Sequence, residues 1–140
     1  MLYHYKNYDN FIFKIIILNK YMIIHKKYVN EEVFQSIYDK KKICEIRLNQ
    51  GSFSEINKND IIIWFYNIEN EEKTIKTQIT KIRKFKSFYN GIKNCRLHNI
   101  FPDINSIKEA LHFCLKPEGF YTKEEETEQG VLCIEFEIIQ

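Results

Sequence analysis

The segment Ile61–Ile68, with the sequence IIIWFYNI, constrains the fold more than any other part of this chain. It is almost continuously apolar, which is typical of a strand that is covered on both faces. The overlapping stretch NIENEEK (67–73) predicts a turn. Thr74–Phe85 then alternates apolar and polar residues, so we expect a long strand paired with the first one.

The residues before this hairpin predict a strand, a helix and a second strand. Met22–Lys26 is a short strand, and Asn30 is a suitable N-cap for a helix that ends near Lys40. The helix has an apolar stripe at helical spacing, which comprises Val33, Phe34, Ile37 and Tyr38. From Ile43 the period becomes two, so a strand should have a core side and a charged side. The core side comprises Cys44, Ile46 and Leu48, and the other side comprises Ile43, Glu45 and Arg47.

The last third of the chain predicts small helices and a closing strand. KSFYNGIKN (86–94) favours a short helix, and Ser106 is placed to cap a second helix that Pro117 stops. That second helix has an apolar stripe made of Ile107, Leu111 and Cys114. TKEEETEQG (122–130) predicts an acidic turn or helical turn with a solvated surface, and Val131–Ile139 predicts a strand. The order of elements predicts an α+β fold, a small β-barrel with short helices packed over one opening.

The chain of 140 residues is consistent with one domain, and its net charge of +2 requires that any nucleic-acid binding use a local basic patch. Residues 1–21 predict an N-terminal extension of unknown role, and 22–140 the domain itself. Phe11–Ile24 is apolar but too short for a membrane span and is interrupted by lysines, so we expect no membrane partner. Four widely spaced cysteines indicate a reduced intracellular protein, cytoplasmic or nuclear.

Sequence motifs of common enzyme classes are absent: there is no GxGxxG, Walker A loop, HExxH or GxSxG. A zinc site could be sought among Cys95, His98, His112 and Cys114. His112 and Cys114 would point in different directions on a helix, so we expect core cysteines, surface histidines and no metal or cofactor. Cys44 faces the predicted core, which disfavours a nucleophilic role.

The stretch DKKKICEIRL (39–48) carries the best candidate site. Lys40 and Lys41 lie at a helix C-terminus, which attracts cations without any function. Glu45 and Arg47 are roughly 7 Å apart on one strand face and could form an ordinary exposed ion pair. Alternatively, Lys42 and Arg47 contact phosphate or a base while Glu45 accepts a base amino group. Aromatic residues that could stack on bases, or simply belong to the core, are Phe88, Tyr89 and Tyr121.

These residues resemble the ASCH domain, a member of the PUA-like superfamily, whose signature is roughly GxKxxExR. Lys42, Glu45 and Arg47 match its charged positions, and Lys40 replaces its glycine. INKNDIIIWF resembles the family's I..GD.I.F segment, with Asn59 at a position where glycine is common and Asp60 matching. TQITKIRKFKSF and GFYTKEEETEQGVLCIEFEI resemble the next strand and the closing segment, so the resemblance extends from about Met22 to Ile139.

The resemblance implies a PUA-like barrel and an RNA-binding cleft lined by the signature residues. Some small bacterial members are amidohydrolases acting on acetylated cytidine, and some are reported as ribonucleases. The amidohydrolases carry a nucleophilic threonine at the position of Glu45, so their mechanism does not transfer. Lys42 and Glu45 could still act as general acid–base groups.

Three hypotheses follow. The leading one is a domain that binds RNA, or a nucleotide or nucleoside, through a cleft lined by Lys42, Glu45 and Arg47, with Lys40, Lys41 and the three aromatic residues nearby. The second is a small hydrolase, an amidohydrolase or ribonuclease, acting on modified nucleosides or RNA. The third is a protein-interaction domain with a degraded site, which the replacement of glycine by Lys40 favours.

Overall fold

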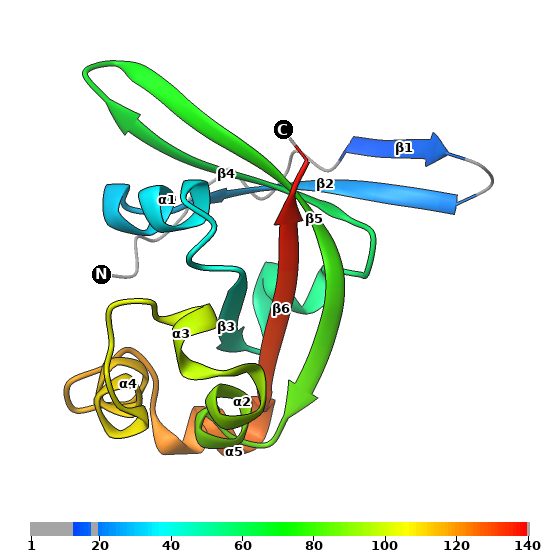
Figure 1. The fold of residues 1–140 in the computed structure, drawn as a ribbon. Coiled ribbons are helices and arrows are strands. Elements are labelled where there is room, and N and C mark those ends of the chain that lie inside the picture. Colours follow the sequence, from blue (N-terminus) through cyan, green and yellow to red (C-terminus); the bar gives the residue numbers. More distant parts are fainter. Residues whose placement is uncertain (1–12, 18–19, 140) are drawn as a thin grey trace.

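The computed structural model describes residues 13–17 and 20–139 (Figure 1). In this part of the chain the strands are β1 (Phe13–Ile17), β2 (Lys20–Tyr28), β3 (Cys44–Leu48), β4 (Ile61–Ile68), β5 (Glu71–Phe85) and β6 (Val131–Ile138). The helices are α1 (Glu31–Tyr38), the 3-10 helix η1 (Gly51–Glu55), α2 (Phe88–Cys95), α3 (Leu97–Ile100), α4 (Ile107–Cys114) and α5 (Lys123–Gln129).

The strands form one mixed sheet in the order β1-β2-β4-β5-β6-β3. Only the pairing of β2 with β4 is parallel among these neighbours. The long strand β5 curves across the molecule and pairs with both β4 and β6, with a shift of register between Ile79 and Lys81 (Figure 1). Strands β1 and β3 end the order and do not pair with each other in the described chain. The predicted α+β fold is therefore confirmed, and its barrel is a curved sheet that does not close.

Strand β1 lies within residues 1–21, where the sequence predicts an extension. It pairs antiparallel with β2, from Phe13 opposite Ile24 to Ile17 opposite Lys20. Residues 1–12 and 18–19 lie outside the described part of the chain. The boundary at residue 22 stays a prediction.

The hairpin between β4 and β5 has a tighter turn than the seven residues predicted for it. Ile68 pairs with Glu71, so the turn consists of Glu69 and Asn70. Both residues have positive φ, 48° and 63°. Two consecutive residues with positive φ are the mark of a type I′ turn, whose twist suits a two-residue hairpin.

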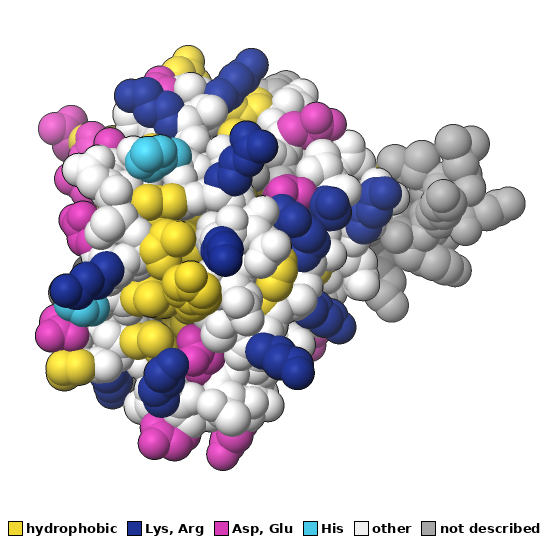
Figure 2. All heavy atoms as spheres, turned by 60° about the horizontal axis from the view of Figure 1, so that its bottom comes forward, with side chains coloured by type: hydrophobic (Ala, Val, Ile, Leu, Met, Phe, Trp, Pro, Cys, Tyr) yellow, Lys and Arg dark blue, Asp and Glu magenta, His cyan; other side chains and the backbone are white. Residues whose placement is uncertain are grey.

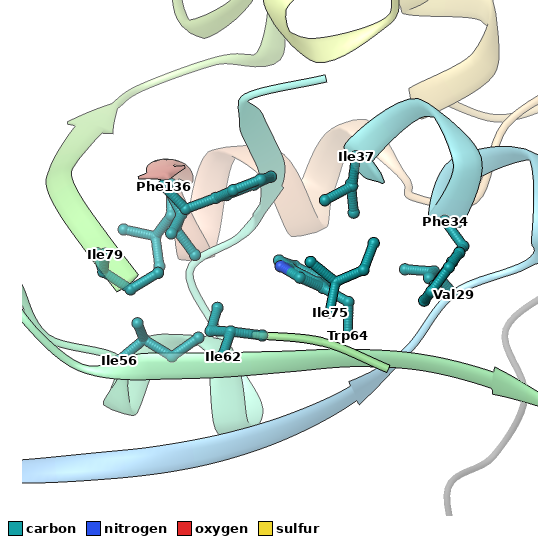
Figure 3. Close-up of a cluster of buried hydrophobic side chains, with 11 residues drawn as sticks. Val29, Phe34, Ile37, Ile56, Ile62, Trp64, Ile75, Ile79 and Phe136 are labelled. Atoms are coloured by element: carbon teal, nitrogen blue, oxygen red, sulfur yellow. The ribbon is translucent and has the colours of Figure 1, made fainter. Parts of the chain in front are cut away.

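One hydrophobic core fills the concave side of the sheet (Figure 3). Its centre is the fully buried Trp64, whose ring contacts that of Phe136 at a centroid distance of 5.3 Å. Helix α1 covers it with Phe34 and Ile37, as the stripe predicts, but Tyr38 is 63% exposed because α1 ends there. The cluster of buried residues consists of Val29, Phe34, Ile37, Ile56, Ile62, Trp64, Ile75, Ile79, Leu132, Ile134 and Phe136.

A second core lies on the other side of β3 and β6, under α2, α3 and α4. These helices gather at one end of the molecule together with α5 (Figure 1). The predicted core side of β3 is confirmed, since Cys44, Ile46 and Leu48 are all buried here. Strand β6 contributes alternate residues to both cores, and it is the strand that joins them.

A buried carboxylate fastens β2 to the start of β4. Asp60 accepts hydrogen bonds at Oδ2 from the backbone N–H of Asn57 (2.9 Å) and at Oδ1 from that of Ile23 (3.2 Å). Its Oδ2 also lies 2.9 Å from Nε2 of His25, and both side chains are buried. Asp60 thus closes the loop before β4 and holds the neighbouring strand.

The helices are short and begin at capping residues. Asn30 and Ser106 cap α1 and α4 as predicted, each accepting a hydrogen bond from the backbone N–H three residues later. Thr122 and Glu125 form a full capping box at α5. Among the helices of the described residues, none has the length and apolar character needed to span a bilayer.

Replacing Thr77 by valine should destabilise the domain by about 1–3 kcal/mol. The buried Thr77 hydroxyl accepts from Nε1 of Trp64 and donates to the carbonyl of Ile62, both at 2.9 Å. Valine keeps the shape but leaves the indole N–H without its acceptor. Urea unfolding would measure the loss, with Thr74→Val, an exposed position on the same strand, as the control. Equal stability of the two variants would contradict the prediction.

Candidate functional site

The turn between α1 and β3 sends its three lysines in different directions. Helix α1 ends at Tyr38, and the backbone N–H groups of Lys41 and Lys42 both donate to the carbonyl of Ser36. The side chains of Lys40 and Lys41 are exposed, whereas Lys42 is buried. The turn therefore brings Lys42 into the protein and leaves its two neighbours in water.

Two residues at positions where the resemblance expects glycine adopt the backbone conformation that glycine favours. Lys40 has φ 59°, and Asn59 has φ 75°. A positive φ in this range is costly for most side chains and is the usual reason for glycine at a turn. The replacement of glycine by Lys40 has therefore kept the turn that positions Lys42.

The three signature residues converge on one carboxylate oxygen. Oε1 of Glu45 lies 3.7 Å from Nζ of Lys42 and 3.5 Å from Nε of Arg47, and it accepts a hydrogen bond from the backbone N–H of Ile46 at 3.1 Å. The side chains of Glu45 and Arg47 are 8% and 31% exposed. The interpretation as an ordinary exposed ion pair is thus wrong, because Glu45 is buried between two cations. A buried charge needs such partners to offset its lost hydration.

Lys42 is mainly an internal anchor. Its ammonium donates to the carbonyl of Ile100 at 2.8 Å and lies 5.6 Å from the ring centre of Phe101. The next residue, Ile43, donates its backbone N–H to the carbonyl of Asn99. Lys42 and Ile43 together fasten the start of β3 to the end of α3. Of the three signature residues, Arg47 is therefore the one that an approaching ligand meets first.

A second cation, Lys27, contacts the same aromatic ring as Arg47. The guanidinium carbon of Arg47 lies 5.1 Å from the ring centre of Phe53 in η1, and Nζ of Lys27 in β2 lies 4.5 Å from the same centre. Lys27 also donates to the hydroxyl of Ser52. Neither Lys27 nor Phe53 was predicted as a site residue. The sequence contains one indication of this part of the site: Phe53 is a single aromatic residue within the polar loop 49–60.

The three aromatic residues predicted to stack on bases have different surroundings. Phe88 is fully buried and stacks on Tyr121 at a centroid distance of 5.6 Å, so its ring faces are not accessible in this conformation. Tyr121 is partly exposed, and Tyr89 on α2 is exposed. Tyr121 and Tyr89 therefore remain candidates, whereas Phe88 serves the second core.

A row of aromatic rings runs from Lys42 along the helical end of the molecule. Each ring lies 5.6–6.4 Å from the next, in the order Phe101, Phe113, Phe120, Tyr121, with Phe88 beneath Tyr121. Phe113 is exposed. The sequence contains one indication of this aromatic row: Phe113 is apolar but lies outside the apolar stripe predicted for α4, so it is not expected in the core. Figure 2 shows a hydrophobic area on the face that includes the bottom of Figure 1, with basic, acidic and histidine side chains around it.

The acidic segment 122–130 is only partly a solvated surface. Glu124 is exposed as predicted, but Glu126 is buried and accepts a hydrogen bond from the backbone N–H of Phe88 at 2.9 Å. Lys123 lies 3.3 Å from Oε1 of Glu126. Glu126 therefore connects α5 to the start of α2. The solvated-surface prediction is wrong for this residue because the capped helix turns one of its carboxylates inward.

The cysteines and histidines do not form the set considered for zinc. Cys95 and Cys114 are buried, while His98 and His112 are exposed. Burial raises the pKa of the Cys114 thiol to about 12, with a smaller contribution in the same direction from Glu45. Cys44 is buried in the second core, as expected of a residue on the core side of β3.

Fold and site together define a small α+β domain in which a charged strand follows directly on the first helix. The chain belongs to the ASCH domain family, whose model matches residues 28–140. This match confirms the resemblance inferred from the sequence.

Solved structures share the fold over most of both chains. The crystal structure of the hypothetical protein PH0355 is 28% identical, with a TM-score of 0.70, and the match covers 83% of this chain and 99% of that one. The solution structure of PF0455 from Pyrococcus furiosus is 26% identical, with a TM-score of 0.66 and coverage of 84% and 98%. The crystal structure of EF3133 from Enterococcus faecalis V583, at 12% identity and a TM-score of 0.52, covers 84% and 82% and shares the fold alone. No curated protein matches the chain.

Proposed function

We propose that this domain binds RNA or a nucleotide at the surface around Arg47. The observation that carries the proposal is the buried carboxylate of Glu45, held between Lys42 and the partly exposed Arg47. Nε of Arg47 lies 3.5 Å from Oε1 of Glu45, and the Arg47 side chain is 31% exposed. A guanidinium is suited to planar, paired hydrogen bonds with a phosphate or a base edge.

The electrostatics of the site favour an anion. Lys27 and Arg47 both contact the ring of Phe53, so two positive charges lie beside this one aromatic side chain. Glu45 is shared with Lys42 and therefore offsets the charge of Arg47 only in part. Lys40 and Lys41, which are exposed in the turn before β3, add two positive charges to this part of the chain. Phosphate contacts from such groups supply most of the affinity in nucleic-acid binding.

Bases would be accommodated on the exposed aromatic residues near this positive region. Lys42 lies against Phe101, the first ring of the aromatic row, and Phe113 is its most exposed member. Stacking on aromatic rings is tolerant of base identity and contributes about 1–3 kcal/mol per base. The arrangement of a basic site beside aromatic rings is typical of proteins that bind single-stranded nucleic acid.

A hydrolase is the second candidate, and one contact favours it. Lys42 and Glu45 are both buried and lie 3.7 Å apart, a separation from which an acid–base pair could act on a bound ligand. Incubation with RNA and with a panel of acylated nucleosides, followed by chromatography, would reveal products. Product formation that disappears in Glu45→Gln would support the hydrolase, whereas binding without products supports the binding domain.

Arg47→Ala is expected to weaken binding of a labelled single-stranded RNA on the order of 10- to 100-fold, because a charge-assisted hydrogen bond contributes about 1.5–3 kcal/mol. The salt dependence of the affinity should also fall by about one contact. Fluorescence anisotropy with the full chain at several salt concentrations measures both quantities. Arg47 is preferable to Lys42 for this test because Lys42 is buried and its loss also affects stability.

Arg83→Ala is the matched control for this experiment. Arg83 also lies on a strand, is 29% exposed and pairs with a carboxylate, that of Glu135 at 3.0 Å. Its contacts are Glu135 and the ring of Phe85, which do not belong to the site around Arg47, so its loss should leave RNA affinity nearly unchanged. Unchanged affinity in Arg47→Ala, or an equal loss in Arg83→Ala, would contradict the proposal.

A further inference from the structure

Three buried cysteines from distant parts of the sequence meet in the second core. Cys44 lies on β3, Cys95 ends α2 and Cys133 lies on β6. Their sulfur atoms are all within 4.8 Å of one another, and the residues are 1%, 2% and 0% exposed. The spacing of the cysteines along the chain does not predict this cluster, because the packing of α2 against β3 and β6 brings the three residues together.

The backbone geometry disfavours a disulfide between the two strand cysteines. Cys44 is paired with Glu135 and Cys133 with Ile46, so the two cysteines are diagonal neighbours on one face. Diagonal neighbours have α-carbons roughly 7–8 Å apart, beyond the usual range for a disulfide. Their side chains nevertheless converge. For Cys44 and Cys133, an atom placed between the sulfurs suits this arrangement better than a direct S–S bond.

Helix α2 packs closely against β3 and β6, and it adds the sulfur of Cys95 to those of Cys44 and Cys133. A Cβ on Gly91 would lie 3.1 Å from Sγ of Cys133 and 3.0 Å from Cδ1 of Ile46, so only glycine fits comfortably. Gly91 is one helical turn before Cys95 and shares its side of the helix. The close approach at Gly91 therefore carries the Cys95 sulfur to the other two.

We propose that Cys44, Cys95 and Cys133 form a binding site for a soft monovalent metal ion, Cu(I). Thiolate sulfur is the ligand type that selects Cu(I), zinc or iron–sulfur clusters among biological metals. Structural zinc almost always has four ligands, and only these three residues form such a group within the described chain. The site is buried, so water is poorly placed to supply a fourth ligand. Three sulfurs in a dry site suit an ion of low coordination number.

Ion binding would change the charge of this core. Each thiol loses its proton to water as its sulfur bonds to the metal, and no electron is transferred. Three thiolates around one Cu(I) leave a net negative charge that needs a neighbouring cation. Arg83 is directly opposite Cys133 in the pairing of β5 with β6; one of its terminal nitrogens pairs with Glu135 at 3.0 Å, and its Nε is buried without a hydrogen-bond partner.

The full chain, reduced and kept free of oxygen, should take up one equivalent of Cu(I) in competition with bicinchoninate. X-ray absorption of the loaded protein should show three sulfur neighbours. Cys133→Ser should lower the affinity by more than about 100-fold, since even residues that only support metal ligands contribute 10- to 100-fold. The wild-type protein should also unfold at a higher temperature with Cu(I) than without it.

Cys114→Ser is the matched control, because Cys114 is buried in the same core but outside the three-sulfur group. It should retain one equivalent of Cu(I). If Cys133→Ser does not fold, Cys95→Ser at the end of α2 provides the same test. Absence of stoichiometric Cu(I) in the wild type, an equal loss in Cys114→Ser, or preferential retention of Zn(II) would each overturn the proposal.

Discussion

Asp60→Ala is expected to lower the free energy of unfolding by about 3 kcal/mol, because hydrogen bonds to a charged group contribute about 1.5–3 kcal/mol each and this carboxylate accepts more than one. Its carboxylate accepts from two backbone N–H groups and contacts the His25 ring. Alanine leaves the N–H groups of Ile23 and Asn57 without their acceptor and removes the partner of a buried imidazole. Guanidinium unfolding, followed by the fluorescence of the single tryptophan, Trp64, measures the change.

Two variants make the Asp60 experiment specific. Asp60→Asn retains the shape and one oxygen acceptor, so it should lose less stability than alanine. Asp39→Ala removes an exposed aspartate at the end of α1 and should change stability by no more than about 0.5 kcal/mol. A loss below about 1 kcal/mol in Asp60→Ala would show that the buried contacts contribute far less than such groups usually do.

Glu45→Gln is expected to destabilise the domain by about 3 kcal/mol, because it leaves the buried ammonium of Lys42 without its negative partner. Glutamine has nearly the same shape and can still accept from the N–H of Ile46. The expected loss is therefore chiefly electrostatic. Chemical unfolding of the variant and the wild type under one set of conditions gives the difference.

A double-mutant cycle isolates the contact between Lys42 and Glu45. Lys42→Met keeps the length of the side chain and removes its charge, although it also loses the hydrogen bond to Ile100. The double variant should be less destabilised than the sum of the single variants by about 1–3 kcal/mol. Additive losses would mean that Lys42 and Glu45 act independently and that Arg47 is the effective partner of the carboxylate.

Local sequence signals predicted most of the secondary structure. Asn30 and Ser106 marked helix starts because their side chains satisfy free N–H groups, and the alternation from Cys44 to Leu48 identified the core side of β3. Local sequence signals could not predict that the opposite side of β3 is also covered. Glu45 has the spacing of an exposed residue, but tertiary packing and two neighbouring cations allow its burial.

The candidate site was predictable only in part, for the same reason. Lys42, Glu45 and Arg47 are close in sequence, so a short motif could identify them together. Lys27 and Phe53 join Arg47 through the parallel pairing of β2 with β4 and the position of η1, which no local pattern reveals. The three-sulfur cluster likewise depends on contacts between residues up to about ninety positions apart.

Strand β6 has a consequence for how this domain unfolds. Its residues alternate between the two cores, and it pairs with β5 on one side and β3 on the other. Neither core can open without removing a wall of the other, so the domain should behave as one cooperative unit rather than as two independently melting halves. Stability changes at Asp60 and at Glu45 can then be compared on a single two-state scale.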